Sequence, residues 1–346
     1  MTENPAYDDS VPERSLWISA PGIAAIESGL ARPEDVVSTH APVLVTTCYS
    51  AISRGTERLV YNGLVPASEH ERMRAPFQSG DFDFPVKYGY ANVGLVAPSE
   101  AADKAGLSGR LVFGLYPHQT AYYADPATLT AVPNGIPPRR AVLAANMETA
   151  LNASWDAAPL PGERIAVVGC GLIGALLIYL CSRIPGVSVL AVETDPLKAE
   201  VLKRLGADRV DASPAEGGYD LVFHTSASQA GLQTALSLAD KEARIIELSW
   251  YGDQPVNVSL GGRFHALRLQ LRSSQVGTIP PAQASRWTFK RRLSTALALL
   301  ADEVLDELLS PDAPFDELPA TMAAICGIKQ PTDLRAPLFC QVVRYL

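Results

Sequence analysis

The chain has 346 residues, of which 47% are hydrophobic and 19% are charged. That composition is typical of a globular protein long enough for two domains. Its formal net charge of −8 argues against nucleic-acid binding, because nucleic-acid-binding surfaces are basic. The five cysteines are odd in number and form no C-x-x-C pair, which disfavours a disulfide framework and a four-cysteine zinc site. We therefore expect free thiols and a cytoplasmic location.

Short β-branched and aromatic runs, separated by proline and glycine, fill most of the N-terminal third. Such spacing is typical of antiparallel strands in a barrel-like or sandwich-like domain. The runs cover residues 42–52, 92–98, 109–124 and 129–138. Residues 1–15 are polar and acidic and lack the basic start and apolar core of a signal peptide. We expect them to form a loose tail.

From Arg139 the pattern becomes helical and then alternates. Residues 139–158 have apolar positions at helical spacing and stop before Pro159. Apolar strands then alternate with helices, in the order 164–169, 172–184, 187–192, 196–208, 219–226, 229–240 and 243–252. This alternation predicts a parallel sheet covered on both faces, an α/β fold. The uncharged run 165–182 resembles a membrane span, but its three glycines favour a strand, a turn and a helix, so we predict no membrane segment.

The C-terminal part departs from this series. After Ala284 a basic helix and a second, apolar helix at 294–309 are expected, followed by a strand at 338–346. Because that last strand lies outside the α/β alternation, we expect it to return to the N-terminal domain.

A glycine motif joins the first strand of the alternation to its helix. Its residues are Gly169, Cys170, Gly171, Leu172, Ile173 and Gly174. The first glycine permits a tight turn, the second lets a pyrophosphate approach the backbone, and the third allows close packing of helix on strand. The helix N-terminus adds free N–H groups and a positive dipole. The motif predicts a dinucleotide site.

An acidic residue follows at the expected place. Glu193 ends the second strand, nineteen residues after Gly174. There a carboxylate would hold the ribose 2′-hydroxyl and repel a 2′-phosphate. We therefore predict NAD as cofactor, with NADP less favoured, although Lys198 lies close enough in sequence to weaken that preference.

From about residue 44 to the end, the chain resembles the medium-chain dehydrogenases/reductases of the alcohol dehydrogenase type. The motifs "GCGLIG", "VETDPLKAEVLKRLGAD" and "PFDELPAT" carry the resemblance. It implies a GroES-like β-rich catalytic domain at 1–150, completed by 279–346, and a Rossmann doubly wound parallel sheet at 151–278. The segment "YSAISRGTERLVYNG" is similar to a narrower group, typified by the dehydrogenase of the bacteriochlorophyllide hydroxyethyl side chain.

The same resemblance implies that the zinc ligands of this family are replaced. The ligand positions fall at Ser53, at the pair Tyr90 and Ala91, and near Thr149. None of these side chains binds zinc well, and no cysteine lies between Cys48 and Cys170 to build a structural zinc lobe. We predict that zinc and every other metal are absent. A rebuilt site using Glu57, His118, Glu148 or Cys48 is the alternative.

Without zinc, hydride transfer needs hydrogen-bond donors and a proton carrier at the reacting oxygen. The candidates at the ligand positions and around them are Ser53, Arg54, Thr56, Glu57, Lys87, Tyr90 and His118. Tyr90 is either a donor to the substrate or a strand residue packed on its neighbours. Lys87 either pairs with Glu57, lowers the Tyr90 pKa, or is simply solvated. His118 is either catalytic or a structural histidine. Arg54 and Glu57 are spaced for a local ion pair.

A basic stretch separates Asp253 from Asp302. It contains no acidic residue and carries Arg263, Arg268, Arg272, Arg286, Lys290, Arg291 and Arg292. These cations either attract an anionic substrate or rim the sheet-edge contact of the homodimer that the resemblance implies. The resemblance also implies that Gln275, Thr225, Ser226 and Ser249 lie at the nicotinamide end of the cofactor site.

Three functions are consistent with these residues. The first is a zinc-independent, NAD-linked oxidoreductase acting on a small carbonyl or alcohol. The second is a reductase of a conjugated C=C bond, which needs less polarisation than a carbonyl. The third is a nucleotide-binding protein that has lost catalysis. The polar residues retained at the former ligand positions favour an enzyme.

Overall fold

The computed structural model describes residues 9–328 and 337–345. These residues form two compact units. The first contains the described parts of 1–142, 311–330 and 342–346, and the second contains those of 143–310 and 331–341. Residues 279–310 therefore lie in the second unit, whereas the sequence analysis placed them in the first domain.

The first unit is built from two antiparallel-rich sheets. One has four strands in the order β2-β1-β5-β4, and the other has seven, in the order β16-β17-β3-β6-β7-β9 with β8 paired to β3. The strands are β1 (Val11–Ala20), β2 (Ile23–Ala31), β3 (Val43–Ile52), β4 (Ser79–Gly80), β5 (Val86–Lys87), β6 (Asn92–Val96), β7 (Leu111–Gly114), β8 (Ala121–Ala124), β9 (Thr130–Ala131), β16 (Ala313–Pro314) and β17 (Gln341–Arg344). The helices of eight or more residues are α1 (Arg54–Tyr61) and α10 (Leu318–Cys326), with shorter turns at α2 (Glu100–Lys104) and α3 (Pro138–Ala141).

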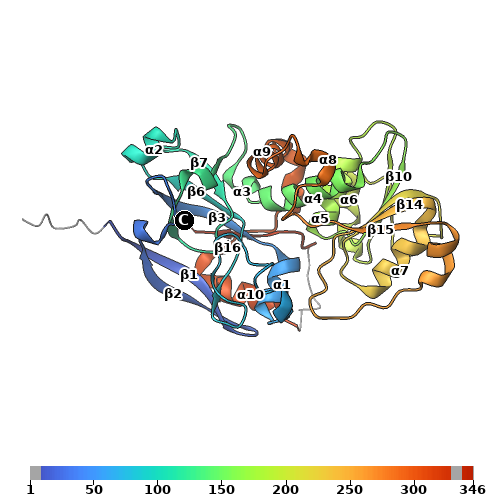
Figure 1. The fold of residues 1–346 in the computed structure, drawn as a ribbon, viewed down its shortest axis with the longest axis horizontal. Helices are drawn as coiled ribbons and strands as arrows, with labels where there is room; N and C mark the ends of the chain where they lie inside the picture. Colours follow the sequence, from blue (N-terminus) through green and yellow to red (C-terminus); the bar gives the residue numbers. More distant parts are fainter. Residues whose placement is uncertain (1–8, 329–336, 346) are drawn as a thin grey trace, which may run out of the picture. The chain divides into compact units, whose positions relative to one another are not determined.

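Two features of this unit bear on the sequence analysis. The strand expected at 338–346 is β17, and it joins the seven-stranded sheet between β16 and β3, so the predicted return of the chain is confirmed. Of the loose tail expected over residues 1–15, residues 1–8 lie outside the described part of the chain. The expectation is wrong from Val11, because β1 begins there and pairs along its length with β2. Figure 1 shows this long hairpin, which the polar start of the chain concealed.

The second unit is a six-stranded parallel sheet covered by helices. Its strand order is β12-β11-β10-β13-β14-β15, which is the doubly wound order of a Rossmann fold. The strands are β10 (Arg164–Val168), β11 (Ser188–Val192), β12 (Arg209–Asp211), β13 (Tyr219–His224), β14 (Ala239–Glu247) and β15 (Gln270–Ser273). The helices are α4 (Ala144–Ala157), α5 (Leu172–Cys181), α6 (Ala199–Leu205), α7 (Gln229–Leu238), α8 (Pro281–Ala284) and α9 (Phe289–Leu299).

Burial explains why these segments are so apolar in sequence. Residues 165–168 of β10 are at most 3% exposed, because α4 and α5 lie on one side of the sheet and α7 on the other (Figure 1). The apolar run 165–182 is therefore β10, a turn and α5. Within the residues that the structure describes, no helix is long and apolar enough to cross a bilayer.

The C-terminal helices differ from expectation. One helix, α9, takes in both the basic residues and the first apolar turns, and it ends at Leu299. A 3₁₀ helix at Glu303–Leu308 follows, with Asp302 as its N-cap. The helix expected at 294–309 is therefore broken, because Asp302 accepts from the backbone of Val304 and starts a new turn.

Candidate dinucleotide and hydroxyl sites

The glycine turn after β10 is shaped by its first and third glycines. Gly169 has a φ of +89°, and a Cβ there would collide with Ser226. A Cβ on Gly174 would collide with the carbonyl of Gly169. Both positions therefore require glycine for the turn and for the packing of α5 on β10.

Gly171 is different, because the protein itself does not require a glycine there. Its φ is −70°, and a Cβ would meet nothing within 4 Å. The missing side chain leaves open space at the N-terminus of α5, whose first residues are Leu172 and Ile173. Unpaired N–H groups and this open space suit a pyrophosphate, so the residues present fit a dinucleotide.

Glu193, at the end of β11, is held by four donors. Its Oε2 accepts from the Cys170 N–H and from Lys198 Nζ, each at 3.1 Å. Its Oε1 accepts from the N–H groups of Thr194 and Asp195 at 2.8 and 2.9 Å. Burial opposes ionisation, but the Asp195 N–H and Lys198 outweigh it and lower the pKa of Glu193. The carboxylate thus braces the glycine turn, and Lys198 stands beside it as expected.

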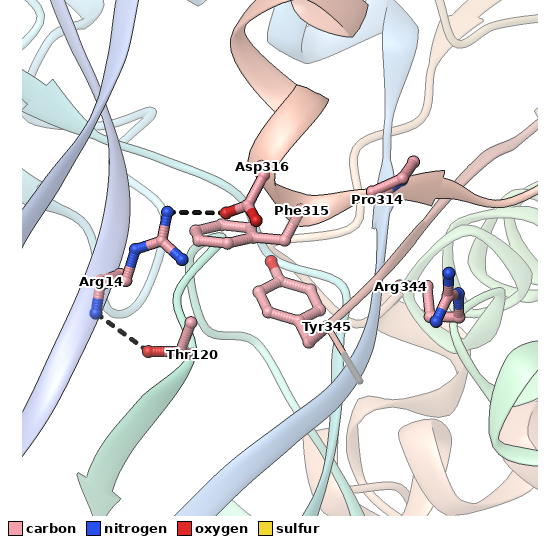
Figure 2. Close-up of a pocket in the computed structure, with 7 residues that line it drawn as sticks. All are labelled: Arg14, Thr120, Pro314, Phe315, Asp316, Arg344 and Tyr345. Carbon is pink, nitrogen blue, oxygen red and sulfur yellow. Dashed lines mark hydrogen bonds and ion pairs between the residues drawn. The ribbon is translucent and has the colours of Figure 1, made fainter.

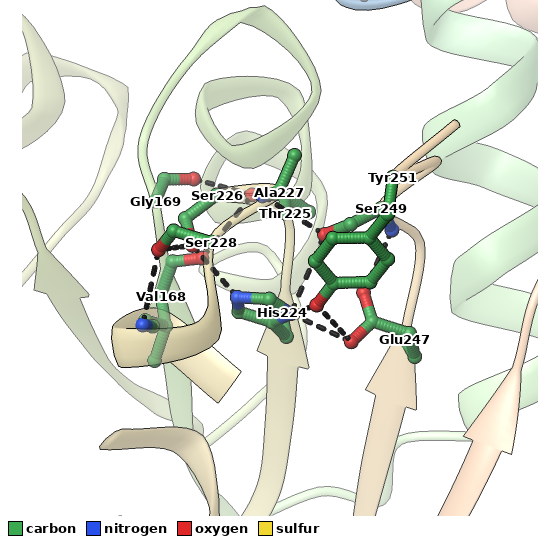
Figure 3. Close-up of polar contacts among 11 residues, drawn as sticks. Val168, Gly169, His224, Thr225, Ser226, Ala227, Ser228, Glu247, Ser249 and Tyr251 are labelled. Atoms are coloured by element: carbon green, nitrogen blue, oxygen red, sulfur yellow. Dashed lines mark hydrogen bonds and ion pairs between the residues drawn. The ribbon is translucent and has the colours of Figure 1, made fainter. Parts of the chain in front are cut away.

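A buried polar network joins the ends of β13 and β14 (Figure 3). His224 is fully buried, with Nδ1 2.7 Å from Glu247 Oε2 and Nε2 2.7 Å from Ser226 Oγ. The Tyr251 hydroxyl donates to the same carboxylate at 3.1 Å. Burial acts to raise the pKa of Glu247, but hydrogen bonds from His224 and Ser249 lower it overall.

The loops after β13 and β14 are tied to each other and to the glycine turn. Thr225 Oγ1 donates to the Gly169 carbonyl, and the Ala227 N–H donates to Ser249 Oγ at 3.0 Å. Thr225, Ser226 and Ser249 therefore lie together at the carboxyl edge of the sheet, where the strand order reverses between β10 and β13. That edge is where doubly wound folds bind ligands.

The loop after β15 is clamped by a buried arginine. Arg292 of α9 is 2% exposed and donates to Glu148 Oε1 at 2.9 Å and to the Val276 carbonyl at 2.6 Å. A third bond runs to Asn152 Oδ1 at 2.5 Å. Gln275 lies in this loop, but its side chain turns back to accept from the Gly277 N–H at 2.6 Å. The Gln275 side chain is therefore bonded within its own loop, and its expected place at the nicotinamide stays a prediction.

In the first unit, Tyr90 belongs to a cluster of three hydroxyls with Ser53 and Thr56. Ser53 is the N-cap position of α1, and Thr56 lies in the first turn of that helix. Burial raises the pKa of Tyr90 to about 12, and hydrogen bonds with Ser53 and Thr56 limit the rise. The phenol is therefore protonated at neutral pH and can donate a hydrogen bond. Tyr90 also packs edge-on against Tyr88, as the packing alternative expects, and its role as a donor to substrate stays a prediction.

His118 and Glu57 form a second buried network, below 3% exposure. His118 Nε2 lies 2.9 Å from Glu57 Oε2, and Nδ1 lies 2.7 Å from Ser50 Oγ. Ser50 is in turn 2.9 Å from the Tyr345 hydroxyl. Glu57 Oε1 accepts from the Ser53 N–H at 2.7 Å. Both ring nitrogens of His118 thus have protein partners, which favours the structural alternative.

Two expected interactions are absent. Lys87 pairs with Glu13 of β1 at 3.2 Å and is only 16% exposed, so it is neither solvated nor paired with Glu57, and it is not among the groups that set the Tyr90 pKa. The predicted Arg54–Glu57 pair is also wrong. Glu57 is turned to His118, while Arg54 Nε donates to the Ile325 carbonyl at 3.2 Å. The sequence could not show these partners, which lie far away along the chain.

The positions where the resemblance expects zinc ligands do not fit zinc. Ser53 and Tyr90 offer neutral hydroxyls, Ala91 offers none, and Thr149 Oγ1 donates to the Ala145 carbonyl at 3.0 Å. Over residues 9–328 and 337–345 no group of three or more His, Cys, Asp or Glu is placed to hold a metal. Of the residues of the alternative site, Glu57 and His118 are bonded to each other, and Glu148 is paired with Arg292.

The basic stretch does not form one cationic surface. Arg268, Arg272 and Arg292 pair with Glu242, Asp156 and Glu148. Arg263 donates to the Ala239 carbonyl. Arg286, Lys290 and Arg291 remain at the surface, with Arg291 stacked on Trp287 at 3.9 Å. Acidic residues distant in sequence neutralise much of the stretch, which weakens the argument for an anionic substrate.

A hollow of about 220 Å³ lies elsewhere on the first unit (Figure 2). It is lined by Arg14, Thr120, Pro314, Phe315, Asp316, Arg344 and Tyr345. Arg14 already pairs with Asp316 at 2.6 Å, and Phe315 stacks on Tyr345. Arg14 and Asp316 are thus engaged with each other, and we place the candidate sites at the glycine turn and at the hydroxyl cluster.

Sequence reasoning missed the partners that complete both buried networks. Ser50 and Tyr345 lie 295 residues apart, and no local pattern links them. His224 could have been found from the sequence. It ends an apolar strand immediately before Thr225 and Ser226, at the edge where doubly wound sheets generally bind ligands. A titratable residue in that position points to the site.

Comparisons with known proteins support the fold. No protein-family model matches the chain. The D-guloside 3-dehydrogenase of Escherichia coli K12 is 24% identical over 205 residues, covering 55% of this chain and 59% of that protein. The chain thus matches about three-fifths of the length of that relative.

Solved structures match along nearly the whole chain. The L-idonate 5-dehydrogenase of Escherichia coli K-12 has a TM-score of 0.75 at 15% identity, covering 97% of this chain and 99% of that one. A dehydrogenase described as zinc-binding, from Sinorhizobium meliloti 1021 and bound to NADP, has a TM-score of 0.73 at 16% identity, covering 96% and 99%. The chain therefore has the α/β fold of the medium-chain dehydrogenases/reductases, a GroES-like domain with a Rossmann domain.

Proposed function

We propose that this protein is an NAD(P)-dependent oxidoreductase that exchanges a hydride between nicotinamide and a small carbonyl/alcohol pair without zinc. The observation that carries the proposal is the open space at Gly171, bounded by two glycines that the turn itself requires. A dinucleotide is the ligand for which this arrangement is used. The cofactor, when bound, supplies the hydride chemistry.

The residues of the second unit bind and orient the cofactor. The N-terminus of α5 holds the pyrophosphate, while Glu193 and Lys198 face the adenosine ribose. We propose NAD as the preferred form, because the lowered pKa of Glu193 keeps a negative charge where NADP carries its phosphate. Lys198, at 3.1 Å from that carboxylate, reduces the preference. Fluorescence titration with NADH and NADPH tests this, and tighter binding of NADPH would contradict it.

The hydroxyl cluster of the first unit orients the substrate oxygen. With a pKa of about 12, Tyr90 keeps its proton and donates a hydrogen bond to an oxygen on which negative charge develops. Ser53 and Thr56 donate to the phenol oxygen, which leaves the Tyr90 hydrogen for the substrate oxygen. Glu57 and His118 hold Ser53 in place from behind, through the Ser53 N–H. This division of roles replaces the metal's polarisation with preorganised donors.

The test is a substrate screen in which the absorbance of the reduced cofactor reports turnover. It covers glycosides, sugar acids and other secondary alcohols with NAD, and aldehydes, ketones and enones with NADH, before and after chelator treatment, with metal analysis of the purified protein. Turnover of a carbonyl/alcohol pair that survives chelation supports the proposal. A stoichiometric, activity-linked zinc would contradict it. Turnover of enones alone would favour the C=C reductase, and cofactor binding with no turnover would favour an inactive nucleotide-binding protein.

We also propose a homodimer formed along β15. All four residues of this edge strand are exposed, and Leu271 is 40% exposed. An unpaired strand edge with an apolar side chain can extend a sheet across two copies. Light scattering with Leu271→Lys tests the idea: the wild type should have the mass of two chains, the variant should shift towards one, and a monomeric wild type would contradict it.

A further inference from the structure

His224, which is buried, and Glu247, which is partly buried, form a pair that the proposed hydride exchange does not use. His224 is fully buried, and both of its ring nitrogens are within 2.7 Å of a side-chain oxygen. One partner, Glu247, lies at the end of the neighbouring strand with 14% of its side chain exposed. The other partner, Ser226, lies on the loop after β13 and is partly exposed. The network thus runs from the interior to the surface of the carboxyl edge.

The hydrogens of this network can be assigned from its acceptors. The ionised Glu247 carboxylate only accepts, so Nδ1 of His224 carries a hydrogen. Glu247 also accepts from the Ser249 N–H at 2.7 Å and from Tyr251. The direction of the bond between Nε2 and Ser226 is the one variable left.

The protonation state of His224 decides that direction. When the imidazole is neutral, Nε2 accepts the hydrogen of the Ser226 hydroxyl. When it is protonated, Nε2 donates to Ser226 Oγ instead. Ser228 Oγ, 2.9 Å from Ser226 Oγ, accepts from the Gly231 N–H and can donate to Ser226 in both states. Protonation therefore frees the Ser226 hydrogen for an acceptor outside the protein.

Among the residues that the structure describes, Glu247 is the one charged side chain bonded to His224. On β14 and the loop beyond it, the titratable neighbours are Glu247 and Tyr251. On β10, His224 is paired with Val168. Helix α7 approaches through Gly231, where a Cβ would lie 2.8 Å from Nε2, and its sequence QAGLQTALSL contains no titratable residue.

Ser226 lies beside the glycine turn. A Cβ on Gly169 would be 2.5 Å from both Cα and Cβ of Ser226, and the preceding Thr225 is bonded to the Gly169 carbonyl. A hydroxyl at this place is within the part of the sheet edge that binds dinucleotide phosphates and riboses. Their oxygens are acceptors.

We propose that Ser226 donates a hydrogen bond to an oxygen of the bound dinucleotide, and that His224, oriented by Glu247, is the positioning residue that frees it to do so by taking up a proton. This inference rests on the proposed dinucleotide binding. Cofactor binding is then linked to proton uptake. Affinity for NADH should therefore be higher at lower pH.

NADH fluorescence titrations of the full-length protein between pH 6 and 8, at constant ionic strength, test this. The wild type should bind NADH about three- to tenfold more tightly at pH 6 than at pH 8, the effect of one net hydrogen bond. Ser226→Ala should lose the gain in affinity between pH 8 and pH 6. Glu247→Gln, which removes the charge that stabilises the imidazolium, should shift the gain to lower pH.

A matched control is Ser237→Ala on α7. Its hydroxyl donates only to the Thr234 carbonyl, and its pH profile should follow the wild type. A Ser226→Ala profile with the wild-type slope, or a wild-type profile without one, would overturn the inference. Failure of the wild type to bind NADH at any pH would instead overturn the proposed function on which the inference rests.

Discussion

The two units each contain a buried histidine with the same kinds of partner, yet the two networks differ in where they end. His118 is bonded to Glu57 and Ser50, and His224 to Glu247 and Ser226. In the first unit the serine is backed by Tyr345 and is 1% exposed. In the second unit the serine is partly exposed on a loop beside the glycine turn. The same set of side chains can thus be structural where its serine is buried, and can contact a ligand where its serine is partly exposed.

The largest expected difference between the networks is in stability. Glu57→Ala leaves the Ser53 N–H and a fully buried His118 without an acceptor, and should lower the stability of the first unit by about 3–5 kcal/mol. Glu247→Ala should cost the second unit about 1–3 kcal/mol, because water can reach the opened end. Hydrogen exchange, followed separately on peptides from β3 and β13 in urea, measures both. Equal losses would contradict the distinction.

The closed network should affect catalysis only through the hydroxyls that it holds. Tyr90→Phe removes the donor to the substrate oxygen and should lower kcat about 100-fold, the usual effect of losing one such donor, with little change in KM. Steady-state kinetics on the substrate found by screening gives the result. Tyr88→Phe is the matched control, since Tyr88 is buried against Tyr90, outside the hydroxyl cluster. Full activity in Tyr90→Phe would remove Tyr90 from the mechanism.

A smaller contrast is expected between the two serines. Ser50→Ala leaves His118 Nδ1 and the Tyr345 hydroxyl without their shared partner and should cost about 1–3 kcal/mol. Ser226→Ala should cost less than about 1 kcal/mol, because water replaces a partly exposed hydroxyl. Thermal unfolding of the two variants compares them. A larger loss for Ser226→Ala would mean that the second network is closed too.

The smallest effect concerns acid stability. The pKa of Glu247 is lowered in the folded protein, so the native state binds that proton less readily than the unfolded state. The resulting stabilisation is present above the unfolded pKa and is lost as the pH falls through the folded pKa. Unfolding free energies measured from pH 6 to pH 3 should therefore decline less steeply in Glu247→Gln than in the wild type. An unchanged slope would contradict the charged assignment of Glu247.

The fold was predictable where each segment carries its own pattern. Because both faces of the sheet are covered, β10 and α5 are almost entirely apolar, and the glycine turn between them is easily recognised in the sequence. The β1–β2 hairpin was missed because β2 is largely exposed and its polar surroundings resemble a tail. The end of α9 at Leu299 was missed because it depends on one N-cap residue, Asp302. The apolar residues at helical spacing on both sides of Asp302 predict a continuous helix.

The site was predictable only as far as sequence neighbours define it. The glycines and Glu193 follow from spacing, and Tyr90 follows from the resemblance. The contacts that decide the roles of Glu57, His118 and Lys87 come from residues 61, 68 and 74 positions away. Long-range partners of this kind are set by the packing of sheets, which no window of sequence contains.

The central claim is that the space at Gly171 exists for a dinucleotide, and one substitution tests it directly. Gly171→Ala adds a methyl group that meets nothing in the protein within 4 Å, at an ordinary φ of −70°. The variant should keep the wild-type melting temperature without cofactor, while its affinity for NADH, measured by fluorescence titration, falls by at least about tenfold because the methyl group occupies the pyrophosphate's place. Unchanged NADH binding in a normally folded Gly171→Ala protein would contradict the account.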